Sequence, residues 1–275
     1  MPGQMNSTAL AAAAFGDNPG CWPLPAANTP EQWWLRAVAA AGQGRYSSAR
    51  ADLAALRRHR STGAWASLSM STEASLLRQL GGHWVAAGWD GRALALAQTA
   101  GDDPMTLQAG VDAVVGLAAD ALGVGRLVAS ARLLERAEKM MRDADAVPTR
   151  LEIRLAWVSA ELAMAGGRGE DAVTHARRGV AVAEKVSPEL RRHRVKSDVV
   201  LAAALCCAGS PELAREVADA ALSETQTYGL VPLRWALACL LADIDSATLT
   251  SQQVSAIRDD CAGVITRRGG RWSPG

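Results

Sequence analysis

Apolar residues recur along this chain at the three- and four-residue spacing of an amphipathic helix. They form segments of about 10 to 20 residues, separated by short stretches rich in glycine, proline and serine, as is typical of antiparallel helix pairs. Thr29, followed by Pro30 and Glu31, marks one clear helix start, with a hydroxyl cap before a first-turn proline. Runs with two-residue alternation of apolar and polar positions are nearly absent. The pattern therefore predicts an all-α protein of roughly twelve helices.

The predicted helices group into consecutive pairs, with first helices expected at residues 30–42, 70–87, 105–122, 149–165, 189–208 and 231–243. The chain then divides into three parts. Residues 1–29 are broken by proline and glycine and form a mobile N-terminal lead-in, in which "TALAAAAF" is a mobile tail or a short helix. Residues 30–268 form the helical domain, and residues 269–275 form a flexible C-terminal tail.

A short unit recurs at the breaks between predicted helices: a glycine, followed five residues later by a small residue that opens the next helix. It occurs at Gly44 and Ala49, Gly88 and Ala93, Gly125 and Ser130, Gly167 and Ala172, and Gly209 and Ala214. The small residues are 44, 37, 42 and 42 residues apart. Self-similarity at such a spacing indicates a repeat protein in which neighbouring helix pairs bury one another.

One unit carries a recognisable motif, made of Leu77, Leu80, Gly81, Trp84, Ala93, Ala97 and Pro104. It resembles the tetratricopeptide repeat pattern W-x2-L-G-x2-Y, A-x3-F and P, and weaker matches extend the resemblance over residues 30 to about 225. The resemblance implies a right-handed α-solenoid of about six antiparallel helix pairs. It also implies that Gly81 lies where two helices cross and that Trp84 is a wedge between helices. Gly82 has no role in this motif.

Helical repeats of this kind line a concave groove with their first helices, so we look for functional residues there. The segment "ELRRHRVK" places Arg191, Arg192, Arg194 and Lys196 at the start of the fifth first helix, where they could bind an acidic group. Arg154 and Arg78 would extend this basic strip. The alternative is a solvated first turn, although cations there oppose the helix dipole.

The tryptophans divide between packing and recognition. Trp33 and Trp34 are adjacent, so they point about 100° apart on a helix, and only one can be fully in the core. We take Trp34 as the candidate binding residue. Trp157 and Trp235 are expected to serve packing.

The residues that would support catalysis are sparse. The four histidines have no metal-ligand spacing, and no glycine-rich segment has the spacing of a phosphate-binding loop. We predict no catalytic residue, metal or cofactor. Asp112 and Glu161 could pair with basic residues nearby. The five cysteines include no C-x-x-C pair and are expected to be reduced thiols.

Composition limits the setting. The net charge of +1 offers no field for nucleic acid, which we do not expect as a partner. No stretch approaches the ~20 apolar residues of a membrane span, and the N-terminal apolar segment has no basic residue before it, so we expect a cytoplasmic protein with no membrane contact. The abundance of alanine, and of arginine over lysine, suggests a bacterial genome rich in G and C.

These observations predict a non-catalytic scaffold or adaptor that binds an acidic or amphipathic segment of another protein in its groove. The alternative is a regulatory sensor that binds a small molecule or signalling peptide and acts on transcription, as the resemblance implies. An open groove favours the scaffold, whereas a closed cavity lined by tryptophan favours the sensor. The oligomeric state is left open.

Overall fold

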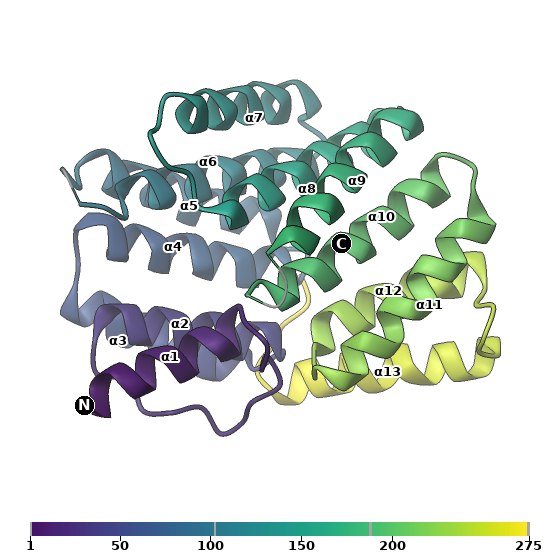
Figure 1. Ribbon diagram of the computed structural model, residues 1–275, viewed down its shortest axis with the longest axis horizontal. Coiled ribbons are helices and arrows are strands. Elements are labelled where there is room, and N and C mark those ends of the chain that lie inside the picture. Colours follow the sequence, from purple (N-terminus) through teal and green to yellow (C-terminus); the bar gives the residue numbers. More distant parts are fainter. Residues whose placement is uncertain (1, 102, 187–188, 274–275) are drawn as a thin grey trace.

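The computed structural model describes residues 2–101, 103–186 and 189–273. Within these ranges the chain forms thirteen helices and no strand, and the helices follow one another as stacked pairs (Figure 1). Their bounds are α1 Pro2–Ala14, α2 Pro30–Gly42, α3 Tyr46–His59, α4 Gly63–Arg78, α5 His83–Gln98, α6 Thr106–Gly123, α7 Leu127–Arg142, α8 Thr149–Ala165, α9 Gly169–Lys185, α10 Arg191–Cys207, α11 Pro211–Thr227, α12 Val231–Ile244 and α13 Ser251–Arg267.

The predicted all-α, solenoid-like arrangement is confirmed. After α1, the described helices form six pairs, and each helix packs on its partner and on the next pair. Five of the six first helices lie within about two residues of their predicted ranges. The exception is the second, predicted at 70–87 and found as α4, because the turn of that repeat lies at residues 79–82 and not at Gly88.

Five of the pairs share the same turn, and its glycine has a conformational reason. The glycine has a positive φ in each case, a backbone conformation that costs an L-residue about 1–2 kcal/mol, and the second helix begins two residues later. The residue five positions after the glycine is small and fully buried where the second helix meets the first. The five pairs of positions are Gly44 and Ala49, Gly81 and Ala86, Gly125 and Ser130, Gly167 and Ala172, and Gly209 and Ala214.

The second unit therefore differs from the prediction. Its glycine and small residue are Gly81 and Ala86, whereas Gly88 lies within α5. Gly81 does not sit at a helix crossing; it supplies the left-handed turn, with φ of +84°. The close approach between helices is made by the small residue five positions later. The motif reading placed this turn inside a helix because Leu77 and Leu80 continue the apolar spacing of α4 up to the turn.

Trp84 was expected to wedge between helices, and this expectation is wrong. Its side chain lies on the first turn of α5 and is 71% exposed, and its ring faces the guanidinium of Arg126. The shift of the turn explains the difference, because it moves Trp84 from the first helix of the pair to the outer side of the second.

The last pair of helices returns to the first, and hydrogen bonds join the two. Arg268 Nη1 donates to the Gln43 carbonyl oxygen at 2.7 Å, and the Ser47 N–H donates to the Arg268 carbonyl oxygen at 3.0 Å. Further on, the Ser273 N–H donates to the Leu80 carbonyl oxygen at 2.8 Å. The C-terminal segment thus runs from α13 back to the first two pairs (Figure 1).

A shared apolar cluster reinforces this closure. Ile265 of α13 is buried with Tyr46 and Leu53 of α3 and with Leu76 of α4, and Trp235 of α12 packs against the same cluster. Buried apolar side chains of the first and last pairs therefore form one core. The array of repeats closes on itself, and its first helices face a common interior.

Both terminal segments contact the helical domain: the short helix expected as one alternative at the N-terminus is present, and the C-terminal segment is tethered although residues 271–273 are exposed. Residues 8–14 of the "TALAAAAF" segment belong to α1, whose Leu10, Ala13 and Ala14 are buried against α2. Residues 269–273 lie against the first two pairs, and Trp272 packs on Trp235 with ring centroids 4.5 Å apart. Local composition missed these contacts because their partners come from elsewhere in the chain.

The turn makes a testable distinction between two neighbouring glycines. Gly81→Ala places a side chain at positive φ and should lower the free energy of unfolding by about 1–2 kcal/mol. Gly82→Ala should change it by less than about 0.5 kcal/mol, because the matching position in the other turns already carries Arg45, Arg126, Arg168 or Ser210. Urea unfolding followed by circular dichroism measures both values. Equal losses in the two variants would contradict the assignment of the turn.

Candidate functional site: a cavity at the centre of the closed array

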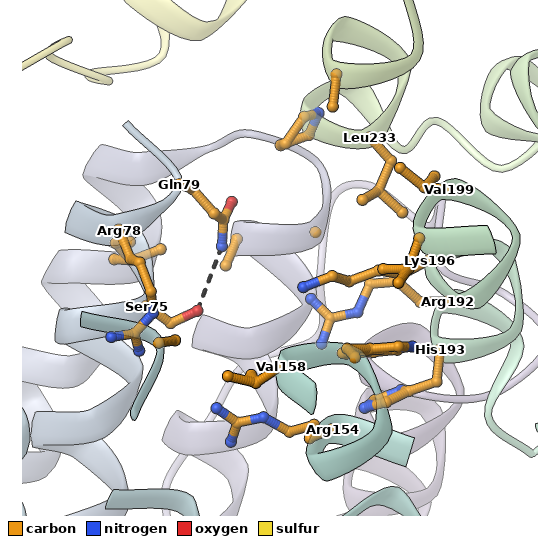
Figure 2. Close-up of a pocket in the computed structure, with 18 of the residues that line it drawn as sticks. Ser75, Arg78, Gln79, Arg154, Val158, Arg192, His193, Lys196, Val199 and Leu233 are labelled. Carbon is orange, nitrogen blue, oxygen red and sulfur yellow. Dashed lines mark hydrogen bonds between the residues drawn. The ribbon is translucent and has the colours of Figure 1, made fainter. Parts of the chain in front are cut away.

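A cavity of about 590 Å³ lies at the centre of the closed array. Each of the six first helices, α2, α4, α6, α8, α10 and α12, contributes residues to its wall. Phe15, in the connection between α1 and α2, and Trp272, after α13, also line it. Four indoles line it, those of Trp34, Trp157, Trp235 and Trp272. Figure 2 shows Arg192 and Lys196 of α10 on one side and Ser75 and Gln79 of α4 on the other.

Helical spacing on α10 aims one stripe of side chains into this cavity. Arg192, Lys196, Val199 and Ala203 follow one another at intervals of four, three and four residues and all line the wall. The stripe changes character along the helix, from two cations near its start to small apolar residues near its end. On α8 the corresponding stripe begins with Arg150 and Arg154 and continues with Trp157, Val158, Glu161 and Met164.

Two arginines share one carboxylate at the start of α8. Arg150 and Arg154 both bind Asp112 of α6, and all three groups line the cavity. Burial raises the pKa of Asp112, but the two guanidinium groups outweigh it and leave that pKa below its usual range. Asp112 is therefore a carboxylate, and it balances only one of the two positive charges.

Arg192 and Lys196 contribute two more positive charges to the same end of the cavity. Among the described residues, Arg192 makes no hydrogen bond or ion pair, and its side chain lies against Gly42 at the end of α2. Burial, together with the nearby Arg150 and Arg154, lowers the pKa of Arg192 to about 10, so it is still charged at neutral pH.

Lys196 rests on an aromatic face. Its Nζ is 4.4 Å from the ring centroid of Trp157, a cation–π contact. Burial lowers the pKa of Lys196, and the carboxylate of Glu161 acts in the opposite direction. Trp157 also stacks on His193, with ring centroids 5.2 Å apart, and donates from Nε1 to Ser197 Oγ at 2.9 Å.

His193 is neutral in this setting. Burial and the surrounding cations, Arg192 first among them, hold its pKa well below its ordinary value. It therefore adds an aromatic surface and no charge. Trp157 thus contacts both Lys196 and His193 of α10 in this part of the cavity wall.

Arg78 belongs to a separate buried network in the cavity wall. Its Nη1 lies 3.0 Å from Asp90 Oδ2 and 2.5 Å from Asp120 Oδ1. Burial raises the pKa of Asp90 to about 7; Arg78 opposes this effect and Asp120 adds to it. Gly116 leaves the space for this network, because a Cβ there would lie 2.2 Å from Asp90 Oδ2. Arg78 is thus held by α5 and α6 through the side-chain oxygens of two aspartates.

Five of the seven candidate binding residues predicted from the sequence line the cavity: Arg78, Arg154, Arg192, Lys196 and Trp34. The other two point elsewhere, because their positions on α10 face a different direction. Arg191 lies over the ring of Tyr228. Arg194 pairs with Asp198 at 2.9 Å and with Glu224 of α11.

Sequence reasoning missed several residues of the wall. Arg150 was not considered, and Trp157 and Trp235 were expected only to pack. The spacing of Arg150, Arg154, Trp157 and Glu161 on α8 places them on one helix face and is the signal that could have identified them. No local signal could have placed Trp272, because it reaches the cavity only through the closure of the array.

The described residues contain no group of three or more histidine, cysteine, aspartate or glutamate side chains that could hold a metal ion. Within the same ranges, no helix combines the length and the apolar character that crossing a membrane requires. Neither the models of known protein families nor the curated proteins give a match to this chain.

The buried network predicts a pH dependence of stability. Asp90 keeps its proton up to about pH 7 in the fold, whereas an aspartate in the unfolded chain loses it near pH 4. Unfolding therefore releases a proton between these values, and the free energy of unfolding falls as the pH rises through this window. In Asp90→Asn this fall should be smaller by more than about 1 kcal/mol.

Urea titrations at pH 4.5, 5.5, 6.5 and 7.5 measure this effect. Asp145→Asn, at an exposed position, is the control and should follow the wild type at every pH. Parallel curves for Asp90→Asn and the wild type would contradict a protonated Asp90.

Proposed function

We propose that this protein is a receptor that binds a small molecule in its central cavity, the sensor alternative raised by the sequence. The observation that carries this proposal is the cavity itself, walled by all six first helices and lined by four indoles. An open groove was the feature that would favour a scaffold. The contacts between the first and last pairs close the array instead, which favours a compact ligand over a long extended segment.

The size and lining of the cavity suit this role. Its volume of about 590 Å³ falls within the ~300–1,000 Å³ of pockets that hold drug-sized ligands. The wall combines aromatic and aliphatic surface, which supplies apolar contact area, with polar and charged groups such as Ser75, Gln79 and Lys196, which can fix the orientation of a ligand.

Ligand binding would be linked to the closure of the array. A molecule in the cavity contacts helices from both ends of the chain, so it stabilises the arrangement in which they face one another. At a ligand concentration of 100 times Kd, this linkage contributes about 2.7 kcal/mol to the free energy of unfolding. Such a change is large enough to shift an equilibrium between closed and open arrays.

The test measures the binding of two fluorescent dyes to the wild type and to a variant in which a large side chain fills part of the cavity. The probes are 8-anilinonaphthalene-1-sulfonate and its uncharged relative N-phenyl-1-naphthylamine, whose fluorescence rises in apolar sites. We expect at least one of them to bind the wild type at one molecule per chain. Ala203→Trp, on the cavity-facing stripe of α10, should weaken that binding by about tenfold or more.

Ala181→Trp, on an exposed position of α9, is the matched control and should bind as the wild type does. No saturable binding of either probe, or equal binding by Ala203→Trp and the control, would contradict the proposed function.

A further inference from the structure

We infer that the ligand is an amphiphilic organic anion, with its acidic group at Arg192, Lys196 and Arg154 and its apolar body against α12 and the second halves of α8 and α10. This inference rests on the proposed function and specifies its ligand class. The acidic group is a carboxylate, sulfonate or phosphate ester, all of which arginine and lysine bind through charge-assisted hydrogen bonds.

The first argument is a surplus of positive charge at one end of the cavity. Four cations, Arg150, Arg154, Arg192 and Lys196, lie along the first halves of α8 and α10. The carboxylates among the cavity-lining residues near them are Asp112 and Glu161. Asp112 is already bound by two arginines. The four cations therefore exceed the two carboxylates by two positive charges, which a bound anion would offset.

The second argument is the state of Arg192. It is a partly buried guanidinium that makes no hydrogen bond or ion pair with any described residue, and Arg150 and Arg154 lie close enough to act on it by charge repulsion. Moving a cation out of water costs free energy unless a partner compensates. Arg194, two positions along the same helix, does have such partners in Asp198 and Glu224. An anionic ligand supplies what Arg192 lacks.

The third argument is the polarity of the cavity along its length. On α10 the stripe runs from Arg192 and Lys196 to Val199 and Ala203, a rise of about 10 Å from Lys196 to Ala203. Leu233 of α12 lies beside Val199 at the apolar end, with Arg154 and His193 at the opposite end (Figure 2). A ligand with one charged end and one apolar end matches this division.

The flat aromatic surface at the boundary adds to the match. Trp157 lines the cavity and contacts Lys196 through its ring face, and Trp235 and Trp272 form an aromatic pair elsewhere in the cavity wall. Indoles bury large apolar areas and stack on flat groups. The body of the ligand is therefore aromatic or aliphatic and carries no charge of its own.

The experiment compares two probes that differ in one charged group. 8-Anilinonaphthalene-1-sulfonate is N-phenyl-1-naphthylamine with an added sulfonate, so the ratio of their dissociation constants isolates the charge. In the wild type we expect the sulfonate probe to bind at least about tenfold more tightly, although it is the less hydrophobic of the two. Inorganic phosphate at 10 mM should not displace it, because phosphate lacks the apolar body.

The double variant Arg192→Gln and Lys196→Gln should lose this preference. Its dissociation constant for the sulfonate probe should rise by about tenfold, whereas that for the uncharged probe should stay within about twofold of the wild-type value. A cooperative urea unfolding transition followed by circular dichroism shows that the variant is folded. The matched control, Arg178→Gln and Lys185→Gln, removes the same two residue types from exposed positions of α9 and should keep the preference.

The outcomes separate this inference from the proposed function. Three results would contradict an amphiphilic anion as the ligand and leave the proposed receptor function intact. They are equal affinities of the wild type for the two probes, an unchanged preference in the double variant, and displacement of the sulfonate probe by phosphate. Absence of binding by either probe would overturn the receptor itself. The wild-type ratio decides the question even if the double variant fails to fold.

Discussion

The contact between the first and last helix pairs turns an array of helix pairs into a closed arrangement with an interior. Ile265 of α13 is buried with Tyr46 of α3, and Arg268 binds the Gln43 carbonyl oxygen at the end of α2. Without these contacts, the inner faces of the six first helices would line an open groove. With them, the same faces surround a cavity of about 590 Å³, and residues more than 200 positions apart in the chain share one wall.

Closure also decides the electrostatics of the interior. In an open array, Arg192 and Lys196 would be solvated by water, and surface charges of this kind contribute little. In the closed array they face Arg150 and Arg154 across a partly dehydrated space, and the single carboxylate of Asp112 serves two arginines. A fold selected only for stability has no reason to gather these cations. Binding sites commonly accept such a cost because the ligand repays it.

The turns within the pairs follow a local rule that the sequence reveals, although the position of one turn differs from the prediction. A glycine with positive φ and a buried small residue five positions later recur in five pairs. Four of the five pairs were identified from the sequence. In the second pair the pattern predicts a turn at Gly88, whereas the turn lies at Gly81, because the glycines at 88 and 91 resemble a break although both lie within α5. For the same reason, the motif match predicted that Gly81 and Trp84 lie at the contact between two helices. In the structure Gly81 lies in the turn and Trp84 is exposed on α5.

Local patterns were enough to predict the all-α class, the six pairs and most of their bounds, because helical periodicity, turn glycines and proline act over a few residues. It also identified five of the residues that line the cavity, since they lie on the faces of first helices. The packing of α1 on α2, the return of residues 269–273 to the first two pairs and the place of Trp272 in the cavity wall emerge from the folded chain alone. The partners of Arg191 and Arg194, which are Tyr228 and Glu224, are likewise contacts between segments that local patterns do not bring together. These contacts depend on how each pair is oriented against its neighbours, and patterns that act over a few residues do not specify that geometry.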